Sequence, residues 1–265
     1  MKKSHDNVYL ELTEKFNQGK TRAIISSGQA VVLHRLAIMS KDGDWIVLEN
    51  QDDLEFILNV LEKHHAVYRF GAPLDVRWLA GGWSSHFEFM RNGIRVRCDF
   101  FSRPPRLSDQ ELSNIWMCQS QEKMPFLDVE SLIKVKLTQR EKDYAVIGEL
   151  ARKQPPEQQL LSSRSAKDLI VLAATYPELV KSFVTERPLL GLAWEGTREA
   201  LEEALDKERR EFMRADERRL DAYAEASVDW RSAWPSLQRS IVNAPLIKAH
   251  DKILQHAQNL LPYAP

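Results

Sequence analysis

The strongest constraint on the fold is the pair Asn92-Gly93, which stands between two segments of alternating polar and apolar residues. Asn-Gly is the dipeptide most typical of a two-residue β-hairpin, because both positions of the tight turn need positive φ angles. We therefore predict a hairpin formed by residues 87–91 and 94–101. Its second strand should have an apolar face (Ile94, Val96, Cys98) and a charged face (Arg95, Arg97, Asp99).

Helical and extended patterns alternate through the rest of residues 1–153. Residues 52–64, for example, carry apolar side chains at helical spacing behind Asp52-Asp53, which can cap the start of a helix. Helices predicted in this way span residues 7–20, 29–36, 52–64 and 129–152. Further strands are predicted at residues 23–25, 44–48 and 66–69.

The character of the chain changes after a polar segment, residues 154–160, which contains two consecutive prolines. Residues 161–265 show helical periodicity, and residues 195–226, rich in Glu, Arg, Asp and Ala, predict one long helix. We expect a first domain at 1–153, a linker at 154–160 and a helical domain at 161–265. The expected fold class is α/β (α+β), with a small mixed sheet flanked by helices and then an all-helical C-terminal region.

Charge and composition exclude several classes of protein. With 37 Lys and Arg against 38 Asp and Glu, the net charge is −1, so a large nonspecific nucleic-acid footprint is not expected. Two cysteines outside any C-x-x-C pair give neither a disulfide scaffold nor a thiolate zinc site. The chain contains no secretory signal pattern and no apolar run of about 20 residues. We expect a cytoplasmic protein without a membrane partner.

Two aspartates, Asp42 and Asp44, begin the strand predicted at 44–48. On an extended chain this spacing places both carboxylates on one face, where they can share a hard divalent cation such as Mg²⁺. Upstream, Ser27-Gly28 forms a turn before a helix, a position where backbone N–H groups can bind phosphate. Carboxylates, Mg²⁺ and phosphate together indicate phosphoryl or nucleotidyl transfer.

Asp99 is the candidate for a third carboxylate. If its strand pairs beside the strand of Asp44, Asp99 joins the metal site. Arg95 and Arg97 share its face of the strand and would then flank bound phosphate.

The pattern of these residues resembles the sequence motifs of the nucleotidyltransferase superfamily. Within it, the pattern is most similar to the bacterial minimal nucleotidyltransferases and the toxins of type IV (abortive-infection) toxin–antitoxin systems. The resemblance covers about residues 20–152, in the order of the family. In step with the family signature are Gly28, Ala30, His34, Ser40, Lys41, Asp42 and Asp44, followed by Lys136, Arg140 and Asp143.

The resemblance implies transfer of a nucleotide from a nucleoside triphosphate to a protein, tRNA or small-molecule acceptor. It also implies a role in a toxin–antitoxin or phage-defence system, with a cognate antitoxin as partner. Two Mg²⁺ ions would be held by Asp42, Asp44 and Asp99, and Asp99 would be a ligand or the general base. Lys136 would neutralise phosphate, and Asp143, on the same helix face as Lys136, would orient Lys136 or Arg140. The implied nucleotide-binding residues are Ser27, Gly28, Lys41, Arg95, Arg97 and Arg140.

Other interpretations of the same residues stay open. Ser27 stands where the family has its first turn glycine, and Ile38 replaces an arginine. Asp42 and Asp44 could belong to a β-turn, Asp99 to a solvated strand, and the basic residues around Lys136 to a solvated helix face. The alternative function is therefore a catalytically inactive nucleotidyltransferase fold that binds a protein or RNA.

Overall fold

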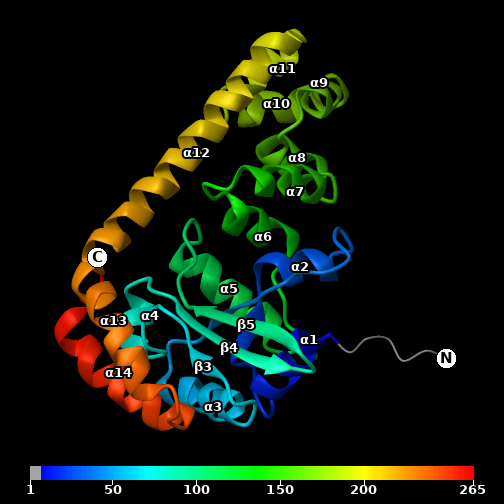
Figure 1. Cartoon of the computed structure of the whole chain (residues 1–265). Helices are drawn as coiled ribbons and strands as arrows, with labels where there is room; N and C mark the ends of the chain where they lie inside the picture. Colours follow the sequence, from blue (N-terminus) through cyan, green and yellow to red (C-terminus); the bar gives the residue numbers. More distant parts are fainter. Residues whose placement is uncertain (1–6) are drawn as a thin grey trace. The chain divides into compact units, whose positions relative to one another are not determined.

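The structure is a computed structural model that describes residues 7–265 and divides into two compact units (Figure 1). Unit 1 combines the chain up to Leu127 with the segment Asp221–Pro265, and unit 2 is Asp128–Leu220. This division differs from the expected boundaries 1–153, 154–160 and 161–265. The last part of the chain returns to the unit that contains the sheet, so unit 2 is an insertion in the sequence of unit 1.

Within the described residues, unit 1 contains a five-stranded mixed sheet in the order β1-β2-β5-β4-β3. β2 runs parallel to β5, and the other neighbouring pairs are antiparallel. The strands are β1 (Ala23–Ile25), β2 (Gly43–Val47), β3 (Val67–Tyr68), β4 (Ser85–Arg91) and β5 (Ile94–Phe101). The predicted fold class, a small mixed sheet flanked by helices and followed by helices, is confirmed.

The predicted β4–β5 hairpin is confirmed, with Arg91 opposite Ile94 across the turn. Asn92 and Gly93 have φ angles of 51° and 75°, the left-handed conformations that a tight hairpin needs. Alternation gives the hairpin a buried face, on which Val96 and Cys98 lie in the core. Ile94 is an exception, because it lies next to the turn and is exposed.

Aromatic side chains fill the core on the buried face of the sheet. Trp45 of β2 stacks on Phe100 of β5 with ring centroids 5.3 Å apart, and Phe16 meets both rings edge-on. The indole N–H of Trp45 donates a hydrogen bond to the hydroxyl of Thr13, so burial leaves this donor satisfied. Helices of the first part of unit 1 are α1 (Val8–Phe16), α2 (Ser27–Leu33), α3 (Gln51–Glu62), α4 (Val76–Ala80) and α5 (Asp109–Gln119).

The C-terminal segment of unit 1 comprises the end of α12 (Arg198–Ala226), α13 (Val228–Ile241) and α14 (Leu246–Leu260). It is tied to the sheet and its loops by specific hydrogen bonds. Trp230 Nε1 donates to the carbonyl of Gly71, and the Tyr223 hydroxyl donates to the carbonyl of Gly81. The C-terminal segment thus helps to hold the loops at both ends of α4 in unit 1.

Unit 2 is helical throughout its regular structure. Its helices are α6 (Val129–Lys136), α7 (Glu141–Ala151), α8 (Pro156–Ser162), α9 (Ala166–Thr175), α10 (Pro177–Phe183), α11 (Leu190–Glu195) and the first part of α12. The continuous helix predicted at 129–152 is wrong, because residues 137–140 separate α6 from α7. The proline pair of the expected linker begins α8 instead, since proline suits the first turn of a helix.

Candidate active site

The parallel pairing of β2 with β5 brings two of the predicted site residues together. Asp44 and Asp99 are register partners, as are Trp45 and Phe100 on the opposite face. Since Trp45 and Phe100 occupy the buried face, Asp44 and Asp99 share the other one. The condition stated for Asp99, that its strand lies beside the strand of Asp44, is met, and this face of the sheet has two adjacent carboxylates.

Asp42 lies just before β2 and has an incompletely satisfied carboxylate. Its Oδ1 atom is buried and has no hydrogen-bond partner among residues 7–265, although the Arg97 guanidinium lies 3.7 Å away. The Tyr9 hydroxyl donates to the carbonyl of Lys41 next to it, at 2.5 Å. Burial raises the pKa of Tyr9 to about 12, and the negative charges of Asp42 and Asp44 add to the shift. The start of β2 therefore combines two carboxylates with the guanidinium of Arg97.

Asp99 is held by two neighbours that the sequence analysis did not assign to the site. Its Oδ1 atom lies 2.8 Å from Nδ1 of His86 and 3.3 Å from the Arg69 guanidinium. His86 is the register partner of Asp99 across the hairpin, and its Nε2 atom lies 3.0 Å from the Ser84 hydroxyl. Counting outward from Asn92-Gly93 pairs His86 with Asp99, so the hairpin signal was sufficient to find this contact.

The predicted phosphate-binding turn begins α2. Ser27 has a φ angle of +47°, a conformation that costs free energy for a residue with a side chain. At Gly28, a Cβ would collide with the Ser40 hydroxyl, so glycine permits this close approach. Of the other predicted binding residues, Lys41 and Arg95 are exposed and Arg97 is half-buried. His34 is part-buried, and its Nε2–H donates a hydrogen bond to the carbonyl of Leu127, 2.8 Å away, which is a structural role.

The donor chemistry of Asp42 and Asp44 suits a hard cation. Magnesium usually takes one or two protein carboxylates and completes its shell with water and substrate phosphates. Within the part of the chain that the structure describes, no group of three or more His, Cys, Asp or Glu side chains is arranged to hold a metal ion. Asp42 and Asp44 could therefore hold a magnesium ion that a triphosphate brings with it, whereas Asp99 Oδ1 already has two partners.

Lys136, Arg140 and Asp143 form a separate cluster within unit 2. Lys136 ends α6 and Asp143 lies in α7, so the prediction that they share one helix face is wrong. They nevertheless form an ion pair, because the turn between the helices brings Lys136 Nζ to 3.0 Å from Asp143 Oδ1. The Thr138 hydroxyl donates to the second carboxylate oxygen, and Arg140 lies 3.6 Å from it. The result is a buried and well-satisfied pair.

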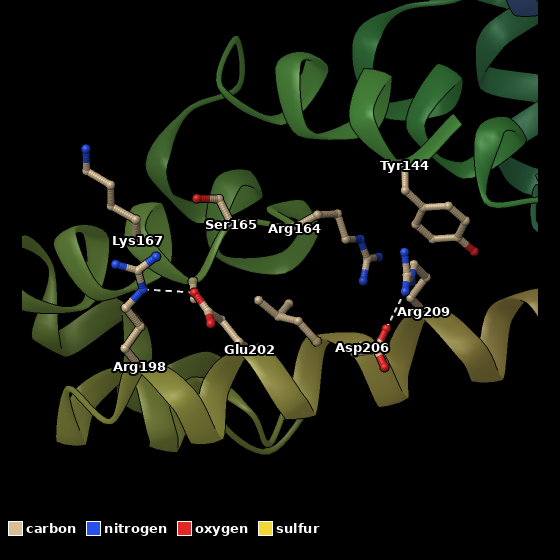
Figure 2. A pocket seen from close by; sticks show the side chains of 10 residues that line it. Tyr144, Arg164, Ser165, Lys167, Arg198, Glu202, Asp206 and Arg209 are labelled. Carbon is tan, nitrogen blue, oxygen red and sulfur yellow. Dashed lines mark hydrogen bonds and ion pairs between the residues drawn. The ribbon is translucent and has the colours of Figure 1, made fainter. Parts of the chain in front are cut away.

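Unit 2 also contains a cavity of about 540 Å³ between α9 and α12 (Figure 2). Figure 2 shows Arg198 paired with Glu202 and Arg209 paired with Asp206 along α12. The lining residues are Tyr144, Arg164, Ser165, Ala166, Lys167, Arg198, Glu202, Leu205, Asp206 and Arg209. Much of its positive charge is neutralised by these pairs within one helix.

No family model matches the sequence, and no curated protein matches it. Two solved structures from Helicobacter pylori are similar to the chain. One, a presumed nucleotidyltransferase, is 14% identical with a TM-score of 0.39, and the match covers 77% of this chain and 98% of that one. The other, JHP933, is 13% identical with a TM-score of 0.39, covering 80% and 97%. No helix within residues 7–265 is both long and apolar enough to cross a membrane.

Proposed function

We propose that this protein is a Mg²⁺-dependent nucleotidyltransferase that moves a nucleotide from a nucleoside triphosphate to an acceptor. The observation that carries the proposal is the parallel β2–β5 register, which sets Asp44 beside Asp99 on one face of the sheet. Asp42 precedes Asp44 and has a buried carboxylate oxygen without a hydrogen-bond partner in residues 7–265. Arg97 supplies positive charge next to these carboxylates.

In this proposal Asp42 and Asp44 hold magnesium together with the triphosphate. The metal, when bound, supplies charge neutralisation and activation of the acceptor oxygen, for which the sequence resemblance implies two ions. Arg97 and Arg95 balance phosphate charge along β5, and Lys41 and the Ser27-Gly28 turn contact the triphosphate tail. We assign Asp99 to positioning rather than to the metal, because His86 and Arg69 occupy its Oδ1 atom.

The acceptor is a protein, a tRNA or a small molecule. The net charge of −1 favours an acceptor that docks on a local patch over a long nucleic-acid footprint. The resemblance to type IV toxins supports a place in a toxin–antitoxin or phage-defence system, with an antitoxin as partner. The catalytic contribution of Lys136, Arg140 and Asp143 stays a prediction of that resemblance.

The test is transfer of label from each α-³²P-labelled nucleoside triphosphate, with Mg²⁺, to bulk tRNA or to proteins of a cell extract. Asp42→Asn and Asp44→Asn should each lower the transfer rate by roughly 100-fold or more, because they remove charge where the metal binds. Asp52→Asn is the matched control, since Asp52 is an exposed aspartate in the first turn of α3. The proposal fails if no nucleotide binds at millimolar Mg²⁺.

The strained turn favours a second candidate, an inactive fold that binds a protein or RNA. Ser27 adopts a positive φ angle where the resembled family has glycine, and Ile38, in place of an arginine, is 98% exposed. This alternative predicts binding of a partner from the extract without any transfer of label. It also predicts that Asp44→Asn leaves that binding unchanged.

A further inference from the structure

Three side chains beside the proposed metal site form a continuous hydrogen-bonded row. The Ser84 hydroxyl lies 3.0 Å from His86 Nε2, and His86 Nδ1 lies 2.8 Å from Asp99 Oδ1. A nucleophile within reach of a base, with the base oriented by a third group, is the general signature of an activated hydroxyl. The row lies within unit 1, on the same face of the sheet as Asp44.

The surroundings fix the geometry of this row. A Cβ at Gly71 would lie 2.5 Å from His86 Cδ2, so the imidazole ring occupies space that only glycine leaves open. The backbone at both residues is also paired, because Ala72 N–H donates to the Ser84 carbonyl and Arg69 N–H donates to the His86 carbonyl. Ser84 itself is partly exposed and can be reached by a ligand.

The charges next to the row select the class of electrophile. Arg69 lies 3.3 Å from Asp99 and 3.7 Å from Glu88, and Arg97 lies opposite Glu88 on the same face. Guanidinium groups match the geometry and charge of phosphate oxygens. This environment suits attack on a phosphorus centre.

We propose that Ser84 is a nucleophile that accepts a nucleotidyl group from a nucleoside triphosphate, so that the protein modifies itself at the residue directly before β4. The proposal rests on the nucleotidyltransferase function proposed above. The Ser84 Oγ–phosphorus bond forms at the α-phosphate, the bond to the bridging oxygen breaks, and pyrophosphate leaves. The hydroxyl proton moves to His86 Nε2, and Asp99, a positioning residue, stabilises the resulting imidazolium.

The test uses the full chain with each nucleoside triphosphate and Mg²⁺, followed by intact-mass and peptide mass spectrometry. The expected result is one added nucleoside monophosphate, located on Ser84 and absent from Ser84→Ala. His86→Gln should slow the modification by roughly 100-fold or more, the usual contribution of a general base. Ser113→Ala is the matched control, because Ser113 is an exposed serine of α5 outside the site.

Two further measurements keep the outcome independent of folding defects and of the proposed function. Gly71→Ala should slow Ser84 modification while all three members of the row are retained, because the added methyl group displaces the His86 ring. A fluorophosphonate, which reacts with activated serine hydroxyls, should label Ser84 but not Ser113, and His86→Gln should suppress the label.

The outcomes separate the two proposals. Transfer of nucleotide to added acceptors with Ser84 unmodified overturns the Ser84 proposal and leaves the nucleotidyltransferase standing. If no nucleotide is transferred at all, both the proposed function and the role of Ser84 as nucleotidyl acceptor are overturned. Labelling by the fluorophosphonate that depends on His86 then supports only the activation of the Ser84 hydroxyl. Equal fluorophosphonate reactivity at Ser84 and Ser113 overturns the activated serine itself.

Discussion

Two charge clusters that the sequence analysis assigned to one site differ in how they are satisfied. In unit 2, the side chains of Lys136 and Asp143 are each 10% exposed and form an ion pair at 3.0 Å. In unit 1, the Asp42 side chain is 42% exposed and one of its oxygens has no hydrogen-bond partner within residues 7–265. Removing one member of a buried ion pair is strongly destabilising because the other charge is left unpaired, whereas a part-exposed and loosely paired carboxylate can bind a ligand. The contrast separates supporting residues from candidate binding residues.

The largest effect is expected at the closed cluster. Asp143→Ala should lower the free energy of unfolding of unit 2 by about 3–5 kcal/mol, because Lys136 is left buried without its partner. Urea unfolding followed by circular dichroism measures the change. Glu141→Ala removes only the exposed pair with Arg209 and should cost less than about 1 kcal/mol. Equal losses of unfolding free energy in Asp143→Ala and Glu141→Ala would show that the buried and the exposed ion pair do not differ.

A second large effect should come from a buried histidine, and not from the open carboxylates. Burial lowers the pKa of His250 from the usual 6.5 of a histidine to about 4. Between these pH values the unfolded chain binds a proton that the folded chain does not. The free energy of unfolding is therefore highest above pH 6.5 and falls as the pH decreases to 4. The loss should approach about 3 kcal/mol. Urea midpoints measured across this pH range test the expectation.

The control for this pH dependence lies in the same helix. His250→Gln should flatten the fall in stability, whereas the exposed His256→Gln should leave it intact. If the free energy of unfolding still falls with decreasing pH in both His250→Gln and His256→Gln, a group other than His250 is titrating.

A smaller effect of opposite sign is expected at the turn before the open site. Ser27→Gly should raise the free energy of unfolding by about 0.5–1 kcal/mol, because glycine adopts a φ angle of +47° without steric cost. Thermal unfolding measures the gain. Ser113→Gly, in the interior of α5, should instead destabilise by about 1 kcal/mol. A loss of stability in Ser27→Gly would show that the serine side chain supports the turn.

The smallest change in stability is expected at the open cluster itself. Asp42→Asn should alter the free energy of unfolding by less than about 0.5 kcal/mol, because the side chain is part-exposed and its pairing with Arg97 is loose. The same variant should weaken Mg²⁺-dependent nucleotide binding, measured by calorimetry. A large loss of stability would place Asp42 with the supporting residues.

Local patterns were sufficient to predict most of the sheet. Alternation, helical periodicity and the Asn92-Gly93 turn are signals carried by adjacent residues, and they located β2, β4, β5 and α3. Such local signals cannot predict the hydrogen bond from Trp230 to Gly71, because it joins segments 159 residues apart. The return of the C-terminal helices to unit 1 was therefore missed.

The site shows the same limit. The D-x-D spacing and strand alternation correctly placed Asp44 and Asp99 on one face once β2 paired with β5. The prediction that Lys136 and Asp143 share a helix failed, because the break at 137–140 has no proline or glycine to mark it. The contact of His86 with Asp99 was available from hairpin register but needed both strands to be counted together.

The insertion of unit 2 into the sequence of unit 1 has a consequence during synthesis of the chain. The first 127 residues leave the ribosome well before Asp221–Pro265, which supplies the remainder of the same unit. At roughly 5–20 residues per second, translation of the intervening segment alone takes on the order of ten seconds. Throughout that interval the nascent sheet lacks Trp230 and Tyr223, which later bond to the loops around α4. The hydrogen bonds that hold these loops therefore form only after unit 2 has been synthesised.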